Sequence, residues 1–358
     1  MRGTGRFDYL DGIRAVAIGA VLALHWVSWY VPLFHGGSIG VDVFFVLSGF
    51  IITTMLWRTP HGWGAFFRRR LVRLYPALIG LVLGSVVLYA VVPWAPTDPA
   101  EVIWRGVVVL TQTSSVWAMG QSGSLWLPGL QPFGQTWSLA VEWYFYLLWP
   151  LLVLAARRRG WTALRLARVS LVAAAATYLA ALPLATFPFY FGPVERFGEL
   201  LVGAALALRL QAGGFRSRGG TVLPALALAA VAAYALLGPD GHSPVYRYVG
   251  LPLGVGAAVV LIHSGYDVAA GPVHRLLAHP WLAAVGRSSY SLYLWHVVPF
   301  LLLQDAPAPK LVLGPVAVLS AVVLTWLSHR FLERPFMGGR SDVLSPAAAV
   351  TPSPAPRA

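Results

Sequence analysis

Three side chains that can carry a proton lie within otherwise apolar stretches of the sequence: His25, Glu142 and His296. If each stretch is a membrane-spanning helix, His25 and Glu142 lie about three residues, or ~4.5 Å, outward of their helix midpoints, and His296 lies close to its own midpoint. An imidazole and a carboxylate in a medium of low dielectric suit general acid–base catalysis, because each group tunes the pKa of the other. Ionisable residues at such depth are costly, so each one is a candidate functional residue. The alternative for either histidine alone is a hydrogen-bonded packing residue.

Arg14 precedes His25 by eleven positions. At 100° per residue this separation is close to three full turns, so the two side chains share one helix face and lie ~16 Å apart along it. Such a face can line a path from the cytoplasm into the core of a helix bundle. The alternative for Arg14 is an ordinary arginine that anchors the start of a membrane helix.

The densest charge in the chain lies in the stretch FFRRRLVRLYP at residues 66–76, which contains Arg68, Arg69, Arg70 and Arg73. A guanidinium group can bind phosphate oxygens through two parallel hydrogen bonds. The cluster therefore indicates a docking site for a cosubstrate that carries a nucleotide. The alternative is membrane anchoring through contact with anionic lipid.

The composition predicts that helices in a bilayer position these residues. Of the 358 residues, 58% are hydrophobic and 11% are charged, against roughly 45–50% and about 25% in soluble proteins. The chain has no cysteine, which excludes disulfides, zinc fingers, iron–sulfur clusters and cysteine nucleophiles, and we expect no metal site. The net charge of +13 would suggest nucleic acid in a soluble protein, but the placement of the charges argues against that partner.

We expect an all-α polytopic membrane protein with about ten transmembrane helices. Apolar runs bounded by charge, proline or glycine place them at residues 13–31, 39–57, 74–93, 136–156, 169–187, 195–211, 221–238, 247–263, 285–304 and 311–330. Residues 94–135 are expected to form one long outer loop with an interfacial or re-entrant helix. We expect residues 1–337 to form the membrane domain and residues 338–358 to form a disordered cytoplasmic tail.

The basic residues predict the orientation of these helices. With the N-terminus in the cytoplasm, all but four of the 26 Lys and Arg residues fall on the cytoplasmic side, the four being Arg105, Arg196, Arg247 and Lys310. Cytoplasmic loops of membrane proteins carry such an excess of positive charge. Both termini are therefore predicted to be cytoplasmic. Glu195 is expected to pair with Arg196 at the outer surface.

Motifs of other transporter and enzyme classes are absent from the sequence. It contains no Walker A motif and no His-x4-Asp pattern, which argues against ATP-driven transport and against the soluble-headed glycerolipid acyltransferases. No internal repeat of fixed period occurs, so the repeat-built transporter folds gain no support.

Taken in order, the motifs of the chain resemble those of acyltransferase family 3, the bacterial integral-membrane O-acyltransferases. They are LDGIRA at 10–15 with the Arg-x10-His spacing, GVDVFFVLSGF at 40–50, the basic block at 67–76, TWSLAVEWYF at 136–145, SYSLYLWH at 289–296 and FLERP at 331–335. The resemblance runs from about residue 6 to residue 336, which is nearly the whole chain.

The resemblance implies a ten-helix protein of the bacterial cytoplasmic membrane with acyl-CoA as cosubstrate and no metal. The enzyme would transfer an acetyl or longer acyl group to a hydroxyl. By the motif match, His25 would be the catalytic histidine and Arg14 its functional partner. Arg69, Arg70 and Arg73 would engage the phosphates of CoA.

The resemblance and the depth of the ionisable groups agree on one mechanism. His25, as neutral imidazole, would take the proton of the acceptor hydroxyl as that hydroxyl attacks the thioester. Glu142 or Asp42 would hold the imidazolium, as a carboxylate orients histidine in other acyl transfers. His296 lies within a family motif. Direct transfer and a transient acyl-histidine are both compatible with these residues.

The leading alternative function is a proton-coupled transporter or flippase in which Arg14, His25 and Glu142 form a ligand and proton path. A structural protein with an inactive site is a third interpretation, which the occupied motif positions disfavour.

The acceptor is expected to be a hydroxyl of an envelope glycan, a lipid-linked sugar or a macrolide-type metabolite. Trp117, Trp126 and Trp137 lie in or next to the predicted outer loop. They can stack on a sugar or a macrocycle, and anchoring at the membrane interface is an equally good interpretation.

Overall fold

A computed structural model describes residues 5–28, 30–58, 62–122, 129–213, 221–266 and 271–336. Over these ranges the chain is helical and contains no β-strand. The longer helices are α1 (Gly5–Leu22), α2 (Ile39–Arg58), α3 (Trp63–Val91), α4 (Pro99–Leu110), α6 (Trp137–Arg158), α7 (Ala163–Ala181), α9 (Pro193–Gln211), α10 (Val222–Leu237), α11 (Leu251–Tyr266) and α16 (Lys310–Ser328). The shorter helices are α5 (Ser114–Met119), α8 (Thr186–Phe191), α12 (Pro272–Leu277), α13 (Pro280–Arg287), α14 (Ser289–Trp295) and α15 (Val298–Leu303). Turns of π-helix are η1 (Ala23–Val27), η4 (Tyr246–Gly250) and η5 (His329–Glu333), and 3₁₀ turns are η2 (His35–Ser38), η3 (Gly134–Thr136) and η6 (Arg334–Phe336).

Within the described residues, the ten predicted apolar ranges lie largely in helix, and the ninth, 285–304, is interrupted at residues 288 and 296–297. Among the described residues, seven helical segments are long and apolar enough to cross a bilayer: Asp8–Val27, His35–Arg58, Trp63–Val91, Gly134–Arg158, Ala163–Ala181, Tyr246–Gly265 and Lys310–Phe336. Val222–Leu237 and Ser289–Leu303 are apolar but shorter, and α9 has the length of a span but carries four charged residues. The predicted all-α polytopic class is confirmed. The location of the termini stays a prediction, and the predicted tail at 338–358 lies outside the described residues.

Large apolar side chains cover the outside of the bundle. Leu311 on α16 is 83% exposed, Trp281 on α13 is 78% exposed, and Leu237 and Val172 are 72% and 70% exposed. A soluble monomer rarely exposes so much contiguous apolar surface, whereas a bilayer covers it. The exposed faces of these helices are therefore lipid-facing.

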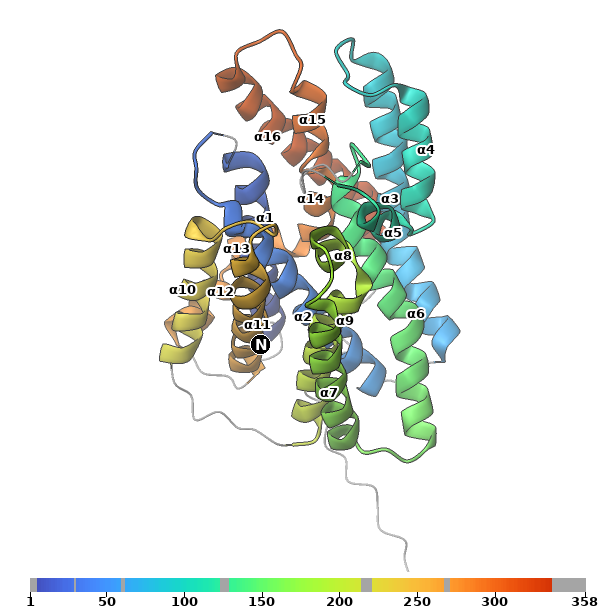
Figure 1. Cartoon of the computed structure of the whole chain (residues 1–358), viewed down its shortest axis with the longest axis vertical. Coiled ribbons are helices and arrows are strands. Elements are labelled where there is room, and N and C mark those ends of the chain that lie inside the picture. The colour runs from blue at the N-terminus through green and yellow to red at the C-terminus, as the bar shows by residue number, and fades with distance from the viewer. Residues whose placement is uncertain are drawn as a thin grey trace, which may run out of the picture.

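Helix α2 lies in the centre of the molecule and joins two groups of helices (Figure 1). It contacts α1 and α11 on one side and α9 and α6 on the other. The crossing with α9 is close because glycine lies at the contact: a Cβ at Gly203 would lie 1.9 Å from the Val46 carbonyl oxygen, and a Cβ at Gly49 would lie 2.0 Å from that of Leu200. Small residues allow such backbone approach between membrane helices.

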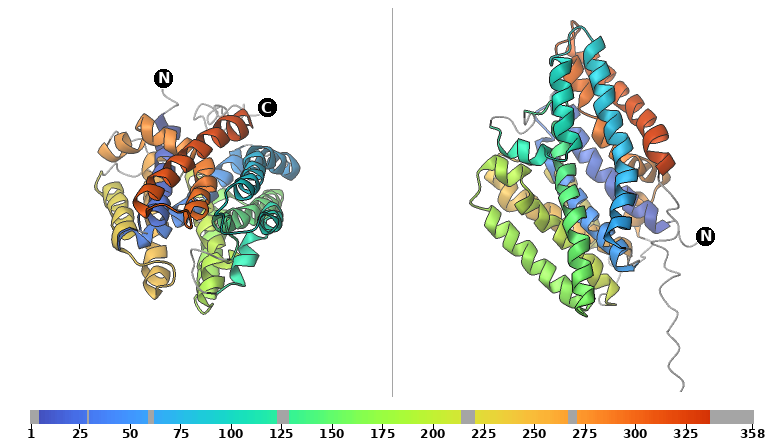
Figure 2. Two further views of the ribbon diagram at one scale, coloured as in Figure 1. Left: turned by 90° about the horizontal axis from the view of Figure 1, so that it is seen from above. Right: turned by 90° about the vertical axis from the view of Figure 1, so that its right-hand side faces the viewer.

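The stretch 94–135 contains α4 and α5. Asp98 caps α4, since its Oδ1 accepts a hydrogen bond from the Ala100 backbone N–H at 2.7 Å, and α4 then packs back along α3. The hairpins α3–α4 and α15–α16 extend beyond the other helices at one end of the bundle (Figure 1, Figure 2). Residues 123–128, which include Trp126, lie outside the described residues. That this stretch faces the outer side of the membrane stays a prediction.

Candidate active site

His25 lies on a π-helical turn that continues α1. Its Nδ1 is 2.8 Å from the Val21 carbonyl oxygen. A carbonyl only accepts, so the neutral ring carries its proton on Nδ1 and its lone pair on Nε2. π-Turns within α-helices are rare and occur frequently at functional sites. The local backbone thus fixes the tautomer in which Nε2 can act as a base.

His296 lies against His25, although 271 positions separate them. The Nε2 atom of His296 is 3.3 Å from Nδ1 of His25, and the rings meet edge to face at 74° with centroids 4.8 Å apart. His296 is fully buried, and its Nδ1 donates to the Tyr293 carbonyl oxygen at 2.7 Å. This bond leaves the lone pair of His296 on Nε2, facing Nδ1–H of His25.

The helix that carries His296 is broken at this residue, because α14 ends at Trp295 and α15 begins at Val298. A break inside a bundle frees backbone carbonyls that need new donors. Side chains supply them: Gln135 Nε2 donates to Leu294 O at 2.7 Å, and Trp26 Nε1 donates to His296 O at 2.9 Å. His296 itself donates a hydrogen bond from Nδ1 to the Tyr293 carbonyl oxygen. The carbonyls of Tyr293, Leu294 and His296 at the break are therefore all hydrogen-bonded.

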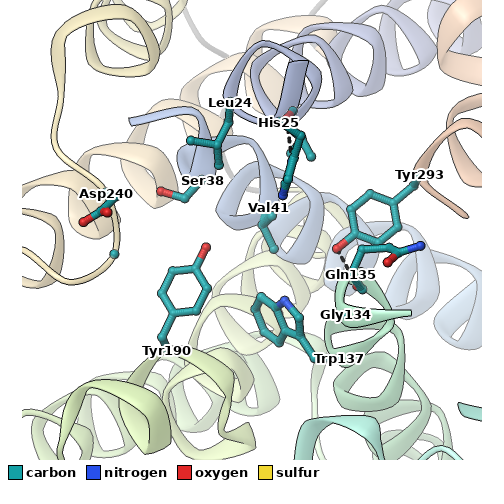
Figure 3. A pocket seen from close by; sticks show the side chains of 12 residues that line it. Leu24, His25, Ser38, Val41, Gly134, Gln135, Trp137, Tyr190, Asp240 and Tyr293 are labelled. Atoms are coloured by element: carbon teal, nitrogen blue, oxygen red, sulfur yellow. Dashed lines mark hydrogen bonds between the residues drawn. The ribbon is translucent and has the colours of Figure 1, made fainter. Parts of the chain in front are cut away.

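The ring of His25 faces a cavity with an empty volume of about 580 Å³. Figure 3 shows the ring pointing toward Trp137 and Gln135 across this space, with Tyr190 and Asp240 at its far side. We call it the His25 cavity; its lining residues are Val21, Leu24, His25, Ser38, Val41, Gly134, Gln135, Trp137, Tyr190, Asp240, Gly241 and Tyr293. These residues lie at the ends of helices or in the loops between them, at the bundle end opposite the arginine block.

A second cavity, with an empty volume of about 750 Å³, lies on the side of the arginine block. Arg14, Arg70 and Arg73 line it, together with Glu142 and Tyr290. We call it the arginine cavity. Val41 and Tyr293 line both cavities, so the two spaces adjoin at these side chains. The side of the first helix that carries Arg14 and His25 thus borders both cavities: Arg14 lines the arginine cavity, and His25 lines the His25 cavity.

Glu142 belongs to the arginine cavity. Its Oε1 accepts a hydrogen bond from Ser48 Oγ at 2.7 Å, and its Oε2 accepts one from Tyr146 Oη at 2.5 Å. The side chain that meets the ring of His25 is the imidazole of His296. Glu142 is therefore placed to balance the positive charge of the arginine cavity.

The three arginines expected to hold phosphate differ in position. Arg70 is buried, and its guanidinium lies over the rings of Phe66 and Tyr146 at 5.5 Å and 5.4 Å from their centroids. Arg73 is half-buried and lines the arginine cavity with Arg70. Arg69 is exposed and is not among the residues that line this cavity. The structure therefore brings two of the three together with Arg14.

Asp42 lies in a separate, fully buried cluster between α2 and α9. Its Oδ1 is 2.8 Å from Nη1 of Arg196 and accepts a hydrogen bond from Tyr246 Oη at 2.7 Å. The same Nη1 of Arg196 donates to Glu199 Oε1 at 2.6 Å, and its Nε is 3.1 Å from Glu195 Oε2. The ion-paired partners of Asp42 thus come from α9.

This cluster corrects one sequence prediction. The predicted pair of Arg196 with Glu195 is present, with Nε 3.1 Å from Oε2, but both residues are buried, so the pair does not lie at an exposed surface. The guanidinium of Arg196 lies 5.3 Å from the Trp137 ring centroid and 4.9 Å from that of Tyr190, and its Nε donates to Tyr190 O. The sequence signal was present, since glutamates four positions apart flank an arginine, but its partner Asp42 is 154 positions away.

Sequence reasoning also missed the contribution of Gln135 and Tyr293 to the site. Gln135 caps the helix break and lines the His25 cavity. Tyr293 Oη donates to Gln135 O at 2.9 Å and lies 2.8 Å from Ser138 Oγ. Tyr293 lies in the motif at 289–296 and Gln135 directly precedes the motif at 136–145, but neither residue type by itself indicates chemistry.

Fold and site together define a class of polytopic membrane protein with a histidine cavity that adjoins an arginine-lined cavity. The sequence model described as "Acyltransferase domain", that of acyltransferase family 3, matches residues 7–330. The chain belongs to this family, which confirms the resemblance of the motifs. No solved structure matches the chain.

Three relatives are similar to this chain in sequence. The "Putative peptidoglycan O-acetyltransferase YrhL" of Bacillus subtilis (strain 168) is 30% identical over 91% of this chain and 54% of its own length. The "Putative membrane-bound transacylase BcsY" of Komagataeibacter xylinus is 31% identical over 91% of this chain and 81% of its own length. The "Peptidoglycan O-acetyltransferase OatA" of Listeria monocytogenes is 30% identical over 91% and 55%. The chain thus spans about half the length of the two relatives named for peptidoglycan.

Proposed function

We propose that this multi-pass membrane O-acyltransferase transfers an acyl group from cytoplasmic acyl-CoA to a hydroxyl of a glycan or glycosylated metabolite, with His25 as the base. One observation carries the proposal: a cavity lined by Arg14, Arg70 and Arg73 adjoins the His25 cavity at Val41 and Tyr293. Family membership and the names of the relatives support an O-acyltransferase.

In this proposal the arginine cavity receives the donor. Arginine forks suit the phosphates of CoA, and three of them converge on one cavity. The thioester arm then extends past Val41 and Tyr293 toward His25. The arginine excess at the ends of the helices supports a cytoplasmic location for this side and for both termini. Residues 1–337 then form the membrane domain, in the bacterial cytoplasmic membrane.

The chemistry follows from the tautomer of His25. Nε2 takes the proton of the acceptor hydroxyl as its oxygen attacks the thioester carbonyl carbon. The C–S bond then breaks, an ester forms, and the CoA thiolate takes the proton from the imidazolium. Nδ1–H of the imidazolium is shared between the Val21 carbonyl oxygen and Nε2 of His296, and both acceptors stabilise the charged ring. Asp42 acts through Arg196 on the wall of the cavity, and Glu142 balances the charge of the arginines.

The test is release of free CoA from acetyl-, propionyl- and longer acyl-CoA by detergent-purified protein, with CoA binding measured on the same sample. A panel of sugar acceptors is included, and His25→Ala is compared with His279→Ala, which changes an exposed histidine. We expect ester formation to fall about 10²–10⁴-fold in His25→Ala and to stay unchanged in His279→Ala. A folded His25→Ala protein with full activity would refute the assignment.

The adjoining cavities also fit a second function, a proton-coupled transporter or flippase with Arg14, His25 and Glu142 along its path. Such a protein would not bind acyl-CoA, and it would cleave no thioester with any acceptor. Binding of CoA that is lost in Arg70→Gln therefore separates the two functions before an acceptor is known.

A further inference from the structure

Four residues of the His25 cavity form a site of mixed character. Trp137 and Tyr190 stand side by side as one wall, with ring centroids 5.4 Å apart and planes inclined by 48°. Gln135 and Asp240 add polar groups on either side of this wall (Figure 3). Ligand sites combine apolar walls and a few polar groups in this way, and the combination has a particular chemistry here.

The amide oxygen of Gln135 is poised to accept a hydrogen bond. Gln135 is 6% exposed, and its Nε2 is used by the Leu294 carbonyl. Its Oε1 has no hydrogen-bond partner among the described residues. Buried polar atoms are nearly always paired, so a ligand that enters this cavity with a hydroxyl would supply the missing donor.

The aromatic wall is held in place from behind. Arg196 lies within 5.3 Å of the Trp137 ring centroid and donates from Nε to the Tyr190 carbonyl at 2.9 Å. Asp42 and Glu199 in turn fix the guanidinium. A rigid aromatic face with a negative quadrupole attracts the polarised C–H groups of a saturated ring.

The charges of the two cavities are opposite. The arginine cavity is lined by three arginines and Glu142, whereas the described residues that line the His25 cavity include Asp240 and no Lys or Arg. Asp240 is about a third exposed at the mouth of the cavity, with His242 Nδ1 3.5 Å from its Oδ2. A carboxylate at the mouth disfavours an anionic ligand and accepts hydrogen bonds from a neutral one.

We propose that the His25 cavity is a subsite for a neutral pyranose ring, with Trp137 and Tyr190 against the C–H face of the ring and Gln135 and Asp240 bonded to its hydroxyls. The assignment of this ring as the acyl acceptor rests on the proposed function. The binding of the ring itself does not, so the two can fail separately.

The test measures binding without turnover. Full-length protein in detergent, free of acyl-CoA, is titrated with methyl β-D-glucopyranoside and with methyl β-D-glucuronide, and binding is read by saturation-transfer NMR. We expect the neutral sugar to bind at least about tenfold more tightly than the anionic sugar, as a charged hydrogen bond and a like-charge contact imply. Asp240→Asn should reduce this ratio to about threefold or less.

Two further variants complete the design. Asp305→Asn changes an exposed aspartate in the loop between α15 and α16, and the preference for the neutral sugar should stay intact. Tyr190→Leu should weaken the binding of the glucoside in a protein that still binds CoA.

Four results would overturn the inference: no glucoside binding by the wild-type protein, equal binding of both sugars, displacement of the glucoside by free CoA, or binding of an uncharged macrolactone in place of the sugars. Sugar binding that depends on Asp240, together with no acyl transfer to any acceptor, would refute the proposed function and leave the sugar subsite standing.

Discussion

Nε2 of His296 lies 3.3 Å from Nδ1 of His25, and each of the two rings is also anchored to a backbone carbonyl within its own helix. The pair has a defined direction, because the single Nδ1–H of His25 is shared between the Val21 carbonyl oxygen at 2.8 Å and the lone pair of His296 Nε2 at 3.3 Å. In the proposed mechanism, His296 thus gives the charged form of His25 a neutral hydrogen-bond acceptor.

Replacing His296 tests this relationship. We expect His296→Phe to lower kcat about 10–100-fold, because the imidazolium at His25 loses a charge-assisted hydrogen bond. The KM for acyl-CoA should stay unchanged, since His296 is not among the lining residues of either cavity. Steady-state kinetics on His296→Phe and on the control His279→Ala measure the effect, and an unchanged kcat would contradict the proposed role.

The arginine block gives a second prediction. Arg70→Gln and Arg73→Gln should each raise the KM for acyl-CoA about tenfold or more, as expected for the loss of a hydrogen bond to a charged group. Arg69→Gln should change it less than about twofold, because Arg69 is exposed outside the cavity. Titration of CoA against the three variants gives the comparison. Equal losses in all three would mean that the block acts through its summed charge.

The buried cluster between α2 and α9 predicts a loss of stability. Arg196→Met would leave Asp42 and Glu199 buried without their counter-ion, and we expect the free energy of unfolding to fall by about 3–5 kcal/mol. Arg287→Met removes a half-exposed ion pair with Asp8 and should cost about 1 kcal/mol or less. The chain has no cysteine for thiol-reactive dyes, so intrinsic tryptophan fluorescence is the suitable readout. Similar melting temperatures for the two variants would refute this prediction.

The close crossing of α2 and α9 gives a steric prediction. A Cβ at Gly203 would meet the Val46 carbonyl oxygen at 1.9 Å, so Gly203→Ala must push the two helices apart. We expect a cost of about 1–3 kcal/mol, as for other overpacked contacts. Gly256→Ala is the matched control, since a Cβ at Gly256 meets nothing within 4 Å. The result to exclude is an equal melting temperature for both proteins.

Much of the fold could be predicted from the sequence, because each span is an apolar run between charges or breakers. The ninth span shows the limit of this reasoning. Residues 285–304 form one apolar stretch in the sequence, whereas the structure breaks the helix between Trp295 and Val298. The side chains that donate hydrogen bonds to the carbonyls freed by the break are those of Trp26 and Gln135, which are remote in the sequence. A local pattern cannot show them.

The sequence predicted which residues belong to the candidate site better than it predicted which of them contact one another. Depth along the helix placed His25, Glu142 and His296 at one level, but sequence says nothing about which helices are neighbours at that level. The structure puts His296 beside His25 and puts Glu142 among the arginines. The pairing of Arg196 with Glu195 was predicted correctly, but its burial was not, because the further partner Asp42 belongs to another helix, far along the chain.

The two cavities share Val41 and Tyr293, but each also has a lining segment of its own: Asp240 and Gly241 line only the His25 cavity, and Arg70 and Arg73 line only the arginine cavity. Recognition at one end can therefore change by substitution while the chemistry and the other end stay as they are. Under the proposed function, related proteins can then differ in the acceptor that they acylate and still use the same acyl donor. Replacing the segment around Asp240 is therefore the substitution expected to change the preference for the acceptor.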